Sequence, residues 1–595
     1  MSYRAPVKDM LFCMKELAGL EAVSKLPGFE DAGVETAQAV LEESAKLNED
    51  VVAPLNRDGD VNPSSWKDGV VTTTPGFKNA FEQFAAGGWQ GLQHPAEFGG
   101  QGLPKTIAAA CIEMLNSANM SFALCPLLTD GAIEALLTAG TPEQQQAFIP
   151  KMIEGAWTGT MNLTEPQAGS DLSLVRTRAE PQPDGSYKLF GTKIFITYGE
   201  HDMAENIVHL VLARVAGAPE GVKGISLFIC PKFLTDGKRN DVFCSSIEHK
   251  LGIKASPTAV LQFGDGTARK DAPGAVAWLI GQENRGLEYM FIMMNAARYA
   301  VGVQGIAIAE RAYQHAVAFA RDRVQSRPVD GSLNKAAPII HHPDVKRMLM
   351  TMRAYTEGCR AMAIVAAAAY DAAHHHPDKD ARAQNQAFYE FMVPLVKGFS
   401  TEMSLEVASL GVQVHGGMGF IEETGAAQYL RDAKILTIYE GTTAIQANDF
   451  VGRKTARDGG TVAKAIAAQI EATEGALAKR SSEDARAVSK HLTAARRAFV
   501  DAVEFVAAQG KSSPNAVFAG SVPYLLLAGN LVAGWQLARA LMAAEDKRTE
   551  DPAFMQAKVL TARFYADHIL SKVPGIRDSI VAGHRAVTDM ALEAF

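Results

Sequence analysis

The stretch YKLFGTKIFIT, Tyr187 to Thr197, breaks a chain that otherwise has helical patterns. Its aromatic and β-branched residues are typical of a strand, and Asp184-Gly185 just before it is a hairpin signal. Similar short β-rich segments, bounded by turn residues, run from about Trp157 to about Gly281. We therefore expect a small β-barrel or sandwich in the middle of the chain.

Helical patterns flank this middle unit on both sides. Apolar residues recur every three or four positions before it, after it to about Gly452, and in an Ala-rich region beyond Asp458. The sequence therefore predicts a mainly α-helical protein with a central β unit. Its expected divisions are an N-terminal arm with a helical domain (1–155), the β unit (156–283), a helical domain (284–455) and a C-terminal helical bundle (456–595).

Composition limits the function classes. The 595 residues are 47% hydrophobic and carry a net charge of −8, which argues against a broad nucleic-acid or anionic-membrane surface. Six scattered cysteines without a CxxC pair indicate a reduced protein, for which we expect a cytoplasmic location. The histidine runs at 341–342 and 374–376 have no cysteine or carboxylate at ligand spacing, so no metal site is expected.

One uncharged segment between Lys511 and Arg539 raises the question of a membrane span. Pro523, Asn530 and Gln536 interrupt it, and its most apolar part is shorter than the roughly 20 residues that a span needs. We expect a helix buried among other helices. The N-terminus has charges throughout and no unbroken apolar segment, so we expect no signal peptide.

Four motifs could bind a ligand. In GTKIFIT (191–197), Phe195 and Thr197 share one face and could meet a flat ring, although an ordinary barrel strand explains them equally. MNLTEPQAGSDL (161–172) could hold a ligand edge or phosphate, or be a turn capped by Asp171. The glycines of GVQVHGGMGF (411–420) and the arginines of FARDRVQSR (319–327) could approach a pyrophosphate, or form a turn and a solvated helix face.

The stretch ILTIYEGTTAIQ (435–446) holds a single carboxylate, Glu440, after an apolar run. No basic residue lies within four positions of it. Such a carboxylate suits a general base, because an apolar pocket raises its pKa toward working pH and a salt bridge would lower it. The alternative is an acid at a helix N-terminus, favoured by the helix dipole.

Taken in order, LTEPQAGSD, GTKIFIT, RYAVGVQGIAIAERAYQHAVAFARDRVQSR, QVHGGMGF and IYEGTTAIQ resemble the acyl-CoA dehydrogenase family. The likeness covers roughly Val34 to Gly452, and the N-terminal arm and C-terminal extension resemble the large bacterial branch. It implies an α-helical domain, a β-barrel and a four-helix domain, with FAD between barrel and helices, followed by the C-terminal helical bundle.

The resemblance also assigns expected roles to individual residues. Around the flavin it places Met161, Leu163, Thr164, Gly169, Ser170, Phe195, Ile196 and Thr197. Toward the FAD of a neighbouring subunit it places Arg323, Gln325, Gln413, Gly416 and Gly417. At the helix start after Glu440 it assigns FAD contacts to Thr442 and Thr443. Substrate contacts fall to Ser170, Asn295, Arg298 and Gly441. Two positions depart from the family's usual pattern: Phe195 stands for tryptophan, and Asn295 for the aspartate of D-x-x-R.

The implied reaction is α,β-desaturation of an acyl-CoA thioester. Glu440 would remove the α-proton while the β-hydrogen leaves as hydride to the flavin, and the N–H of Glu440 would polarise the thioester carbonyl. The resemblance implies electron-transfer flavoprotein as acceptor. The first candidate substrate is 3-methylmercaptopropionyl-CoA; the alternative is a medium- or long-chain fatty acyl-CoA, with the pocket floor expected within CIEMLNSANMSFALC (111–125).

Two other classes share these motifs or this fold. An acyl-CoA oxidase would use the same base but pass electrons to oxygen. A DNA-binding relative would need a basic C-terminal extension, whereas residues 458–595 mix acids and bases. We further expect a homodimer, in which the extension covers the surface that a second dimer would occupy.

Overall fold

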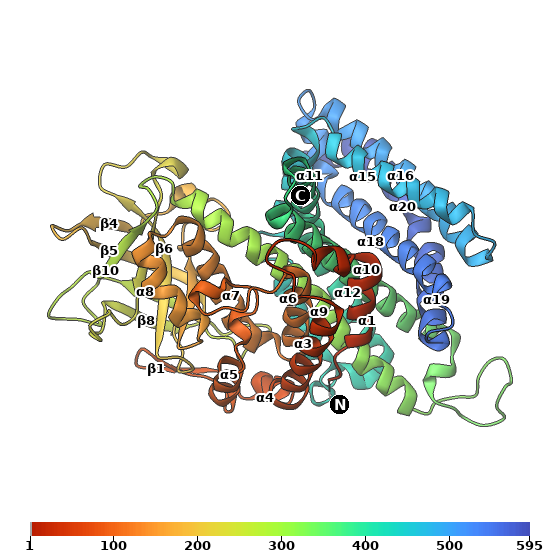
Figure 1. The fold of residues 1–595 in the computed structure, drawn as a ribbon, viewed down its shortest axis with the longest axis horizontal. Coiled ribbons are helices and arrows are strands. Elements are labelled where there is room, and N and C mark those ends of the chain that lie inside the picture. The colour runs from red at the N-terminus through yellow and green to blue at the C-terminus, as the bar shows by residue number, and fades with distance from the viewer. Residues whose placement is uncertain (1–2) are drawn as a thin grey trace.

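The computed structural model describes residues 3–595, and its β strands gather at one side of a mostly helical molecule (Figure 1). The expected mainly helical fold with a central barrel is confirmed. The helices before the barrel are α1 (Val7–Phe12), α2 (Leu20–Val23), α3 (Val34–Leu47), α4 (Leu55–Val61), α5 (Phe77–Ala86), α6 (Lys105–Ala118), α7 (Met120–Ala139) and α8 (Pro142–Ile153).

A short hairpin within the first helical unit is absent from the sequence prediction. Strands β1 (Ser65–Lys67) and β2 (Val70–Thr72) pair antiparallel, with Lys67 opposite Val70. The two residues of the turn, Asp68 and Gly69, both have positive φ (52° and 85°). This is the two-residue turn that Asp-Gly favours, so the dipeptide was a signal that the prediction overlooked.

The middle unit is a closed barrel. Its strands are β3 (Trp157–Asn162), β4 (Arg178–Pro181), β5 (Tyr187–Thr197), β6 (Asn206–Val215), β7 (Ser226–Pro231), β8 (Val242–Ile247), β9 (Thr258–Phe263) and β10 (Ala275–Ile280). Strand β10 pairs with both β7 and β5 and so closes the ring β10-β7-β6-β4-β5, while β9 and β8 extend from β5 and β3 runs parallel to β6. The hairpin expected at Asp184-Gly185 joins β4 to β5.

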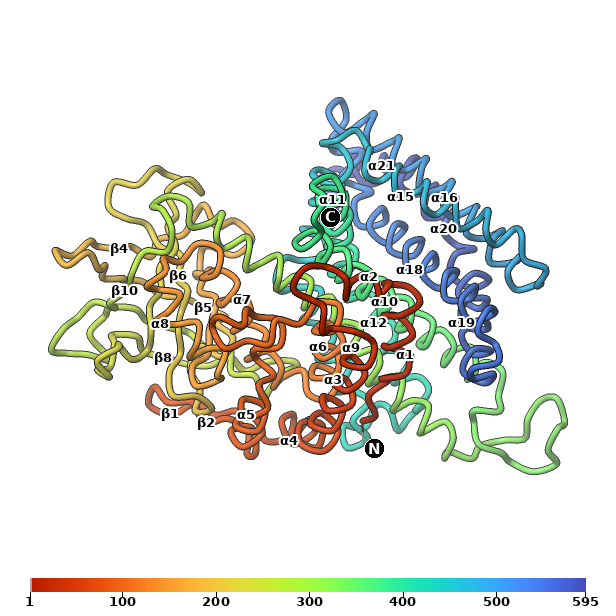
Figure 2. The backbone as a smooth tube through the Cα atoms, in the orientation of Figure 1, coloured from red at the N-terminus to blue at the C-terminus, as the bar shows by residue number. Residues whose placement is uncertain are grey.

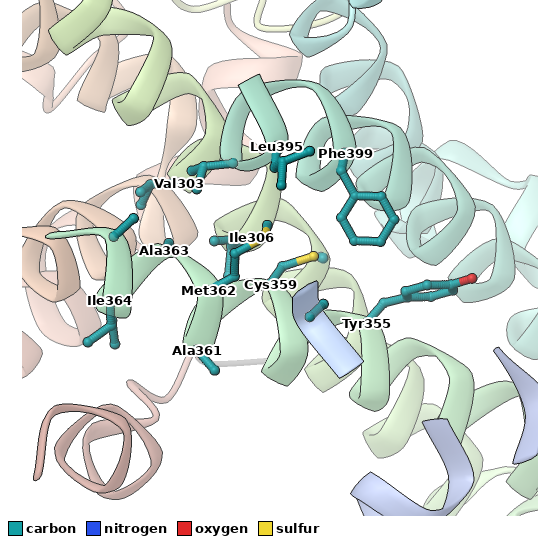
Figure 3. Close-up of a cluster of buried hydrophobic side chains, with 14 of the residues drawn as sticks. Val303, Ile306, Tyr355, Cys359, Ala361, Met362, Ala363, Ile364, Leu395 and Phe399 are labelled. Carbon is teal, nitrogen blue, oxygen red and sulfur yellow. The ribbon is translucent and has the colours of Figure 1, made fainter. Parts of the chain in front are cut away.

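A second set of helices follows the barrel and forms the core of the molecule. It comprises α9 (Gly286–Asp322), α10 (Pro343–His375), α11 (Lys379–Pro394), the π-helical turn η8 (Leu395–Phe399), α12 (Ser400–His415), the 3-10 turn η9 (Gly416–Phe420), α13 (Ala426–Leu436) and α14 (Thr443–Val451). Figure 3 shows where three of these elements meet: Ile306 of α9, Met362 and Tyr355 of α10, and Leu395 and Phe399 of η8 belong to one buried cluster. This packing fixes η8 between α9 and α10.

The C-terminal extension is a further layer of helices that packs on the same core. Its elements are α15 (Thr461–Ala478), α16 (Glu483–Gln509), α17 (Pro514–Ala519), α18 (Ser521–Asp546), α19 (Pro552–His568), α20 (Val573–Ala582) and α21 (His584–Thr588). Helix α18 contacts α10 and α14, and the N-terminal arm runs beside α10 (Figure 2). The chain therefore brings its first and last helical segments to one junction.

Three helices, α7, α9 and α18, are long and apolar enough to cross a membrane by length and composition alone. In each, most of the apolar window is buried within the protein, 83% of it in α18. The prediction of a buried helix between Lys511 and Arg539 is therefore confirmed. Gly529 of α18 serves this packing, since a Cβ there would lie 2.2 Å from Cγ of Phe399 in η8.

Candidate active site

The loop after β3 is tied to strand β5. The N–H of Ile194 donates to the carbonyl of Thr164 (2.9 Å), and Nζ of the buried Lys193 donates to the carbonyl of Leu163 (3.0 Å). Lys193 also pairs with Glu165 at 2.8 Å, and this cation is one cause of the lowered pKa of Glu165, about 2, against the opposing effect of burial. The two motifs MNLTEP and GTKIFIT thus form one rigid surface.

Phe195 projects from this surface. A bulge between Lys193 and Ile196 interrupts the pairing of β5 with β9, and Phe195 takes a left-handed backbone (φ 59°). Its ring is 58% exposed, whereas Ile196 points into the barrel core. A bulge that turns an aromatic ring outward suits contact with a flat ligand.

The other residues expected around the flavin have different degrees of exposure. Gly169 and Ser170 are exposed in the loop after β3, while Leu163, Thr164 and Thr197 are partly buried. The side chain of Met161 packs instead in the apolar cluster beneath α7 and α8. At Met161 and at Ile196, only the backbone faces a possible ligand on this surface.

Glu440 lies in a tight turn between α13 and α14. Its backbone is left-handed (φ 54°), and Gly441 follows with φ 86°. A Cβ at Gly441 would lie 2.8 Å from Nε2 of Gln446, so the position needs glycine both for conformation and for space. Thr442 caps α14 by accepting from the N–H of Ile445 (3.3 Å), which confirms that a helix begins after Glu440.

The electrostatic surroundings of Glu440 favour a carboxylate of raised pKa. Burial raises the pKa of Glu440, and the cations of Arg298 and Lys397 oppose this effect without reversing it. Neither cation is ion-paired with Glu440 within residues 3–595: Lys397 donates to two backbone carbonyls, and Nε of Arg298 has no partner. The backbone N–H of Glu440 also finds no acceptor in this part of the chain, so it is free to meet a ligand oxygen.

Several side chains around Glu440 already have hydrogen-bond partners inside the protein. The hydroxyl of Thr443 donates to Glu402 (2.5 Å), so it is committed inside the protein, while Thr442 stays partly exposed. Tyr439 donates its hydroxyl to Gln304 (2.5 Å), and Gln304 donates to Asn116 on α6 (2.9 Å). The sequence prediction missed this chain, because no local pattern links α6 to the Glu440 turn.

A cavity of about 580 Å³ opens among α6, α7 and α9. Its walls include Asn295 and Arg298 of α9 and, from the segment expected to form a pocket floor, Cys111, Ile112, Leu115, Asn116 and Ala123. The fold therefore brings two expected substrate positions and part of the expected floor to one cavity, whereas Ser170, Glu440 and Gly441 are not among its lining residues. Asp130, Glu134 and Lys105 add charged groups to its lining.

Arg298 is the most informative residue of this cavity. It is only 7% exposed, yet its Nε has no hydrogen-bond partner and no carboxylate pairs with it among the described residues. Burial accordingly lowers its pKa, with Asp449 and Glu440 giving only partial compensation. A buried Nε–H without a partner is costly, and its position in the cavity wall points to a ligand that completes the guanidinium's hydrogen bonds.

The remaining site residues lie at the far end of α9. Arg323 follows α9, 25 residues after Arg298, which corresponds to about 37 Å of helix. There Arg323 covers the ring of Phe319, and Phe319 contacts His415 at 4.4 Å between ring centroids, next to the exposed Gly416 and Gly417. Gln325 and Gln413 are also exposed at this end. The chain thus forms two groups of expected ligand contacts, one beside the first half of α9 and the other at its C-terminal end.

Four family models match the chain in order. They are described as acyl-CoA dehydrogenase N-terminal domain (35–156), middle domain (160–265) and C-terminal domain (284–454), and as acetyl-CoA dehydrogenase C-terminal like (462–591). Together they span the helical, barrel and helical parts and the C-terminal extension.

Whole-chain relatives agree with these matches. The chain is 53% identical over 596 residues to the 3-methylmercaptopropionyl-CoA dehydrogenase of Ruegeria pomeroyi, covering 99% of this chain and 98% of that protein. It is 36% identical to the broad-specificity linear acyl-CoA dehydrogenase FadE5 of Mycobacterium tuberculosis, with 100% of both chains covered. A Bacillus anthracis acyl-CoA dehydrogenase structure with FAD has TM-score 0.74 at 21% identity, covering 94% of this chain and 90% of that one, which shows the shared fold.

Proposed function

We propose that this chain, which belongs to the acyl-CoA dehydrogenase family of oxidoreductases acting on CH–CH donors, desaturates an acyl-CoA thioester between the α and β carbons, with Glu440 as base and FAD as cofactor. The surroundings of Glu440 carry the proposal. Glu440 has a raised pKa and a free N–H in the turn before α14, and the nearby Arg298 lacks a partner in the cavity.

The residues of the barrel surface fit FAD. The exposed ring of Phe195 offers a stacking face, and Gly169 has open space where a Cβ would be. Leu163 and Thr164 are held against β5 and would follow the flavin edge, with Ser170 and Thr197 nearby. The chemistry that FAD supplies when bound is acceptance of the substrate's β-hydrogen as a hydride.

Glu440 performs the proton transfer. Its carboxylate takes the α-proton, and its own N–H donates to the thioester carbonyl, which stabilises the negative charge that develops on that oxygen. Gln446 and Ile445 occupy the space that a Cβ at Gly441 would need, so the glycine keeps the turn tight beside the proposed thioester position. Arg298 and Asn295 meet the polar CoA portion, so that the guanidinium gains the partner it lacks in the free protein.

Assembly supplies the second group of contacts. Arg323 lies at the other end of α9 from Arg298, which supports contact of its group with the FAD of a second subunit. The group comprises Arg323, Gln325, Gln413, Gly416 and Gly417. A homodimer provides this arrangement. The extension packs on α10 and α14 of its own chain, which supports its covering a surface that a larger assembly would use.

The substrate proposed is 3-methylmercaptopropionyl-CoA, supported by 53% identity across the chain to a dehydrogenase of that name. A linear fatty acyl-CoA is the second candidate, because the 36% identical relative is named for broad specificity toward linear substrates. Electron-transfer flavoprotein is the proposed acceptor. An oxidase would instead turn over rapidly with oxygen alone.

The test compares flavin bleaching by a panel of acyl-CoA thioesters in the wild type and in Glu440→Gln. The wild type should carry one FAD per chain and bleach fastest with 3-methylmercaptopropionyl-CoA. Glu440→Gln should keep FAD and substrate binding but lose about 10²–10⁴ in rate, as expected when a positioned base is removed. A colourless protein that takes up no FAD, or bleaching of Glu440→Gln at wild-type speed, would overturn the proposal.

A further inference from the structure

A buried lysine stands behind the Glu440 turn, and the proposed chemistry does not use it. Lys397 lies in η8 and is 0% exposed. Pro394, which has no N–H to donate, immediately precedes this π-helical turn, and such turns often mark functional positions. Leu395 and Phe399 anchor η8 in the apolar core (Figure 3), so the backbone at Lys397 has little freedom.

The ammonium of Lys397 donates hydrogen bonds to both ends of the turn. Its Nζ donates to the carbonyl of Leu436 (2.9 Å), where α13 ends, and to that of Gly441 (2.6 Å), just before α14. On the other side, Nε2 of the buried Gln446 donates to the carbonyls of Glu440 (3.2 Å) and Gly441 (3.4 Å). Two side chains from two elements therefore satisfy carbonyls that the turn leaves without helical partners.

This support matters because the turn is intrinsically disfavoured. A glutamate at φ 54° lies in the left-handed region, which L residues avoid, and such a conformation persists only where its surroundings enforce it. Relaxation of Glu440 toward an ordinary backbone would turn both its carboxylate and its N–H away from their present directions. Neither group could then serve the reaction.

We propose that Lys397 is a positioning residue for proton abstraction: its ammonium, together with Gln446, holds the turn so that the Glu440 carboxylate and N–H face the thioester. This inference rests on Glu440 being the base. Lys397 does not touch the substrate, and its effect passes through the carbonyls of Leu436 and Gly441.

A pH dependence follows from the charge of Lys397. Burial lowers the pKa of Lys397 to about 8; Glu440 of the turn and Glu402 of α12 act against this, while Arg298 of α9 adds to it. Above that pH the amine loses its charge, and its hydrogen bonds to the two carbonyls weaken. Proton abstraction should therefore slow on the alkaline side, in addition to its decline at low pH as Glu440 becomes protonated.

The experiment compares Lys397→Met and Lys397→Arg with Lys250→Met in the FAD-loaded full chain. Lys250 is the matched control: it also donates to a carbonyl, that of Ser256 (2.8 Å), and its pKa is also about 8, but it does not contact the turn. Lys397→Met should lower kcat by about 10–100-fold, since small misplacements of reacting groups have effects of that size. KM should change less than about threefold.

Three readouts separate positioning from general destabilisation. In Lys397→Met the deuterium isotope effect on flavin reduction, measured with α-deuterated substrate, should rise. The decrease of the reduction rate at alkaline pH should vanish. Amide hydrogen exchange should increase over residues 436–446 but not in the barrel. Lys397→Arg should recover part of kcat. Lys250→Met should leave all of these unchanged.

Opposite outcomes are equally clear. A Lys397→Met rate within twofold of wild type overturns the inference, as does a loss of kcat with unchanged isotope effect and unchanged exchange over 436–446. If that variant does not fold, Lys397→Arg and Gln446→Met decide by the isotope effect and by exchange over 436–446, while the rate decrease at alkaline pH should remain in Gln446→Met. An inactive Glu440→Gln beside a fully active Lys397→Met removes the inference alone, whereas an active Glu440→Gln removes the base assignment as well.

Discussion

Two buried arginines in this chain, Arg298 and Arg360, have opposite surroundings. Arg360 of α10 is 1% exposed and donates to Asp9 (2.7 Å), Glu113 (2.5 Å) and Glu310 (2.6 Å). Burial disfavours its charge, but these carboxylates outweigh that effect and raise its pKa well above the ordinary value. Arg298 is nearly as buried, has no such partner in the described chain, and has a lowered pKa.

The difference separates a structural cation from one held ready for a ligand. Arg360 joins the N-terminal arm, α6, α9 and α10, and the network continues through Asp9 to Lys558 of the extension. Every charge there has a partner inside the protein, so the cluster has no unpaired charge to offer a ligand and its role is structural. Arg298 instead costs free energy in the unliganded protein, which is expected where binding of a ligand is meant to compensate.

The largest effect should come from Arg360→Met. Removing this cation leaves Glu113 and Glu310 buried without their partner, and breaking a buried pair in this way typically costs about 3–5 kcal/mol. We expect lower thermal and urea midpoints, with unchanged KM in whatever protein remains folded. A stability loss below about 1 kcal/mol would show that the cluster contributes little and would remove the contrast with Arg298.

Arg298→Met should show the reverse pattern. The thermal midpoint of this variant should equal or exceed that of the wild type, because an unpaired buried charge is removed. Affinity for the CoA thioester should fall about 10–100-fold, since a hydrogen bond to a charged group contributes about 1.5–3 kcal/mol. The measurement is KM together with equilibrium binding, with Arg298→Lys as the charge-preserving control. A destabilised variant of normal affinity would make Arg298 structural.

The next largest effect should be the pH dependence of flavin reduction, which follows the protonation of Glu440. Only the ionised carboxylate accepts a proton, so flavin reduction should fall about tenfold per pH unit below its pKa. Burial raises that pKa above the ordinary 4.5, and the decline should therefore begin above that value as pH falls. Arg298 opposes the shift, so Arg298→Met should move the decline to still higher pH, measured at saturating substrate. An unmoved profile would mean that Arg298 does not influence the base.

The sequence predicted the elements better than the contacts between them. The aromatic and β-branched residues of YKLFGTKIFIT predicted the strand, and the helix expected after Glu440 begins where the sequence indicated, because both are local features. Phe195 was expected on a regular strand face, but the bulge that turns it outward depends on pairing with β9, which no local pattern encodes.

The neighbours of the candidate base could not be predicted from the sequence, for the same reason. Lys397 lies 44 residues before Gly441 and meets it only through the packing of η8. The absence of cations within four positions of Glu440 was correct as a statement about sequence, yet the fold brings Arg298 and Lys397 near it. The lack of a partner for Arg298 can be recognised only when the positions of all its neighbours in the fold are known.

The smallest effect should come from Lys8→Met, which tests whether burial or connectivity explains the strength of the Arg360 cluster. Lys8 of α1 pairs with Asp551 at the start of α19, and the adjacent Asp9 pairs with Lys558 of the same helix, so both bonds join the same two elements. The side chains of Lys8 and Asp551 are 60% and 37% exposed, whereas those of Lys558 and Asp9 are 2% and 10% exposed.

Water can replace the partner of an exposed charge, so Lys8→Met should cost only about 0–1 kcal/mol. Asp551 would also keep its second role, since it accepts from the N–H of Phe554 and caps α19. Lys558→Met is the matched comparison and should cost about 3–5 kcal/mol, because Asp9 and Glu357 would both lose a buried partner. Equal losses in the two variants, measured by urea midpoints, would mean that the junction depends on linkage between the arm and the extension and not on desolvation of its charges.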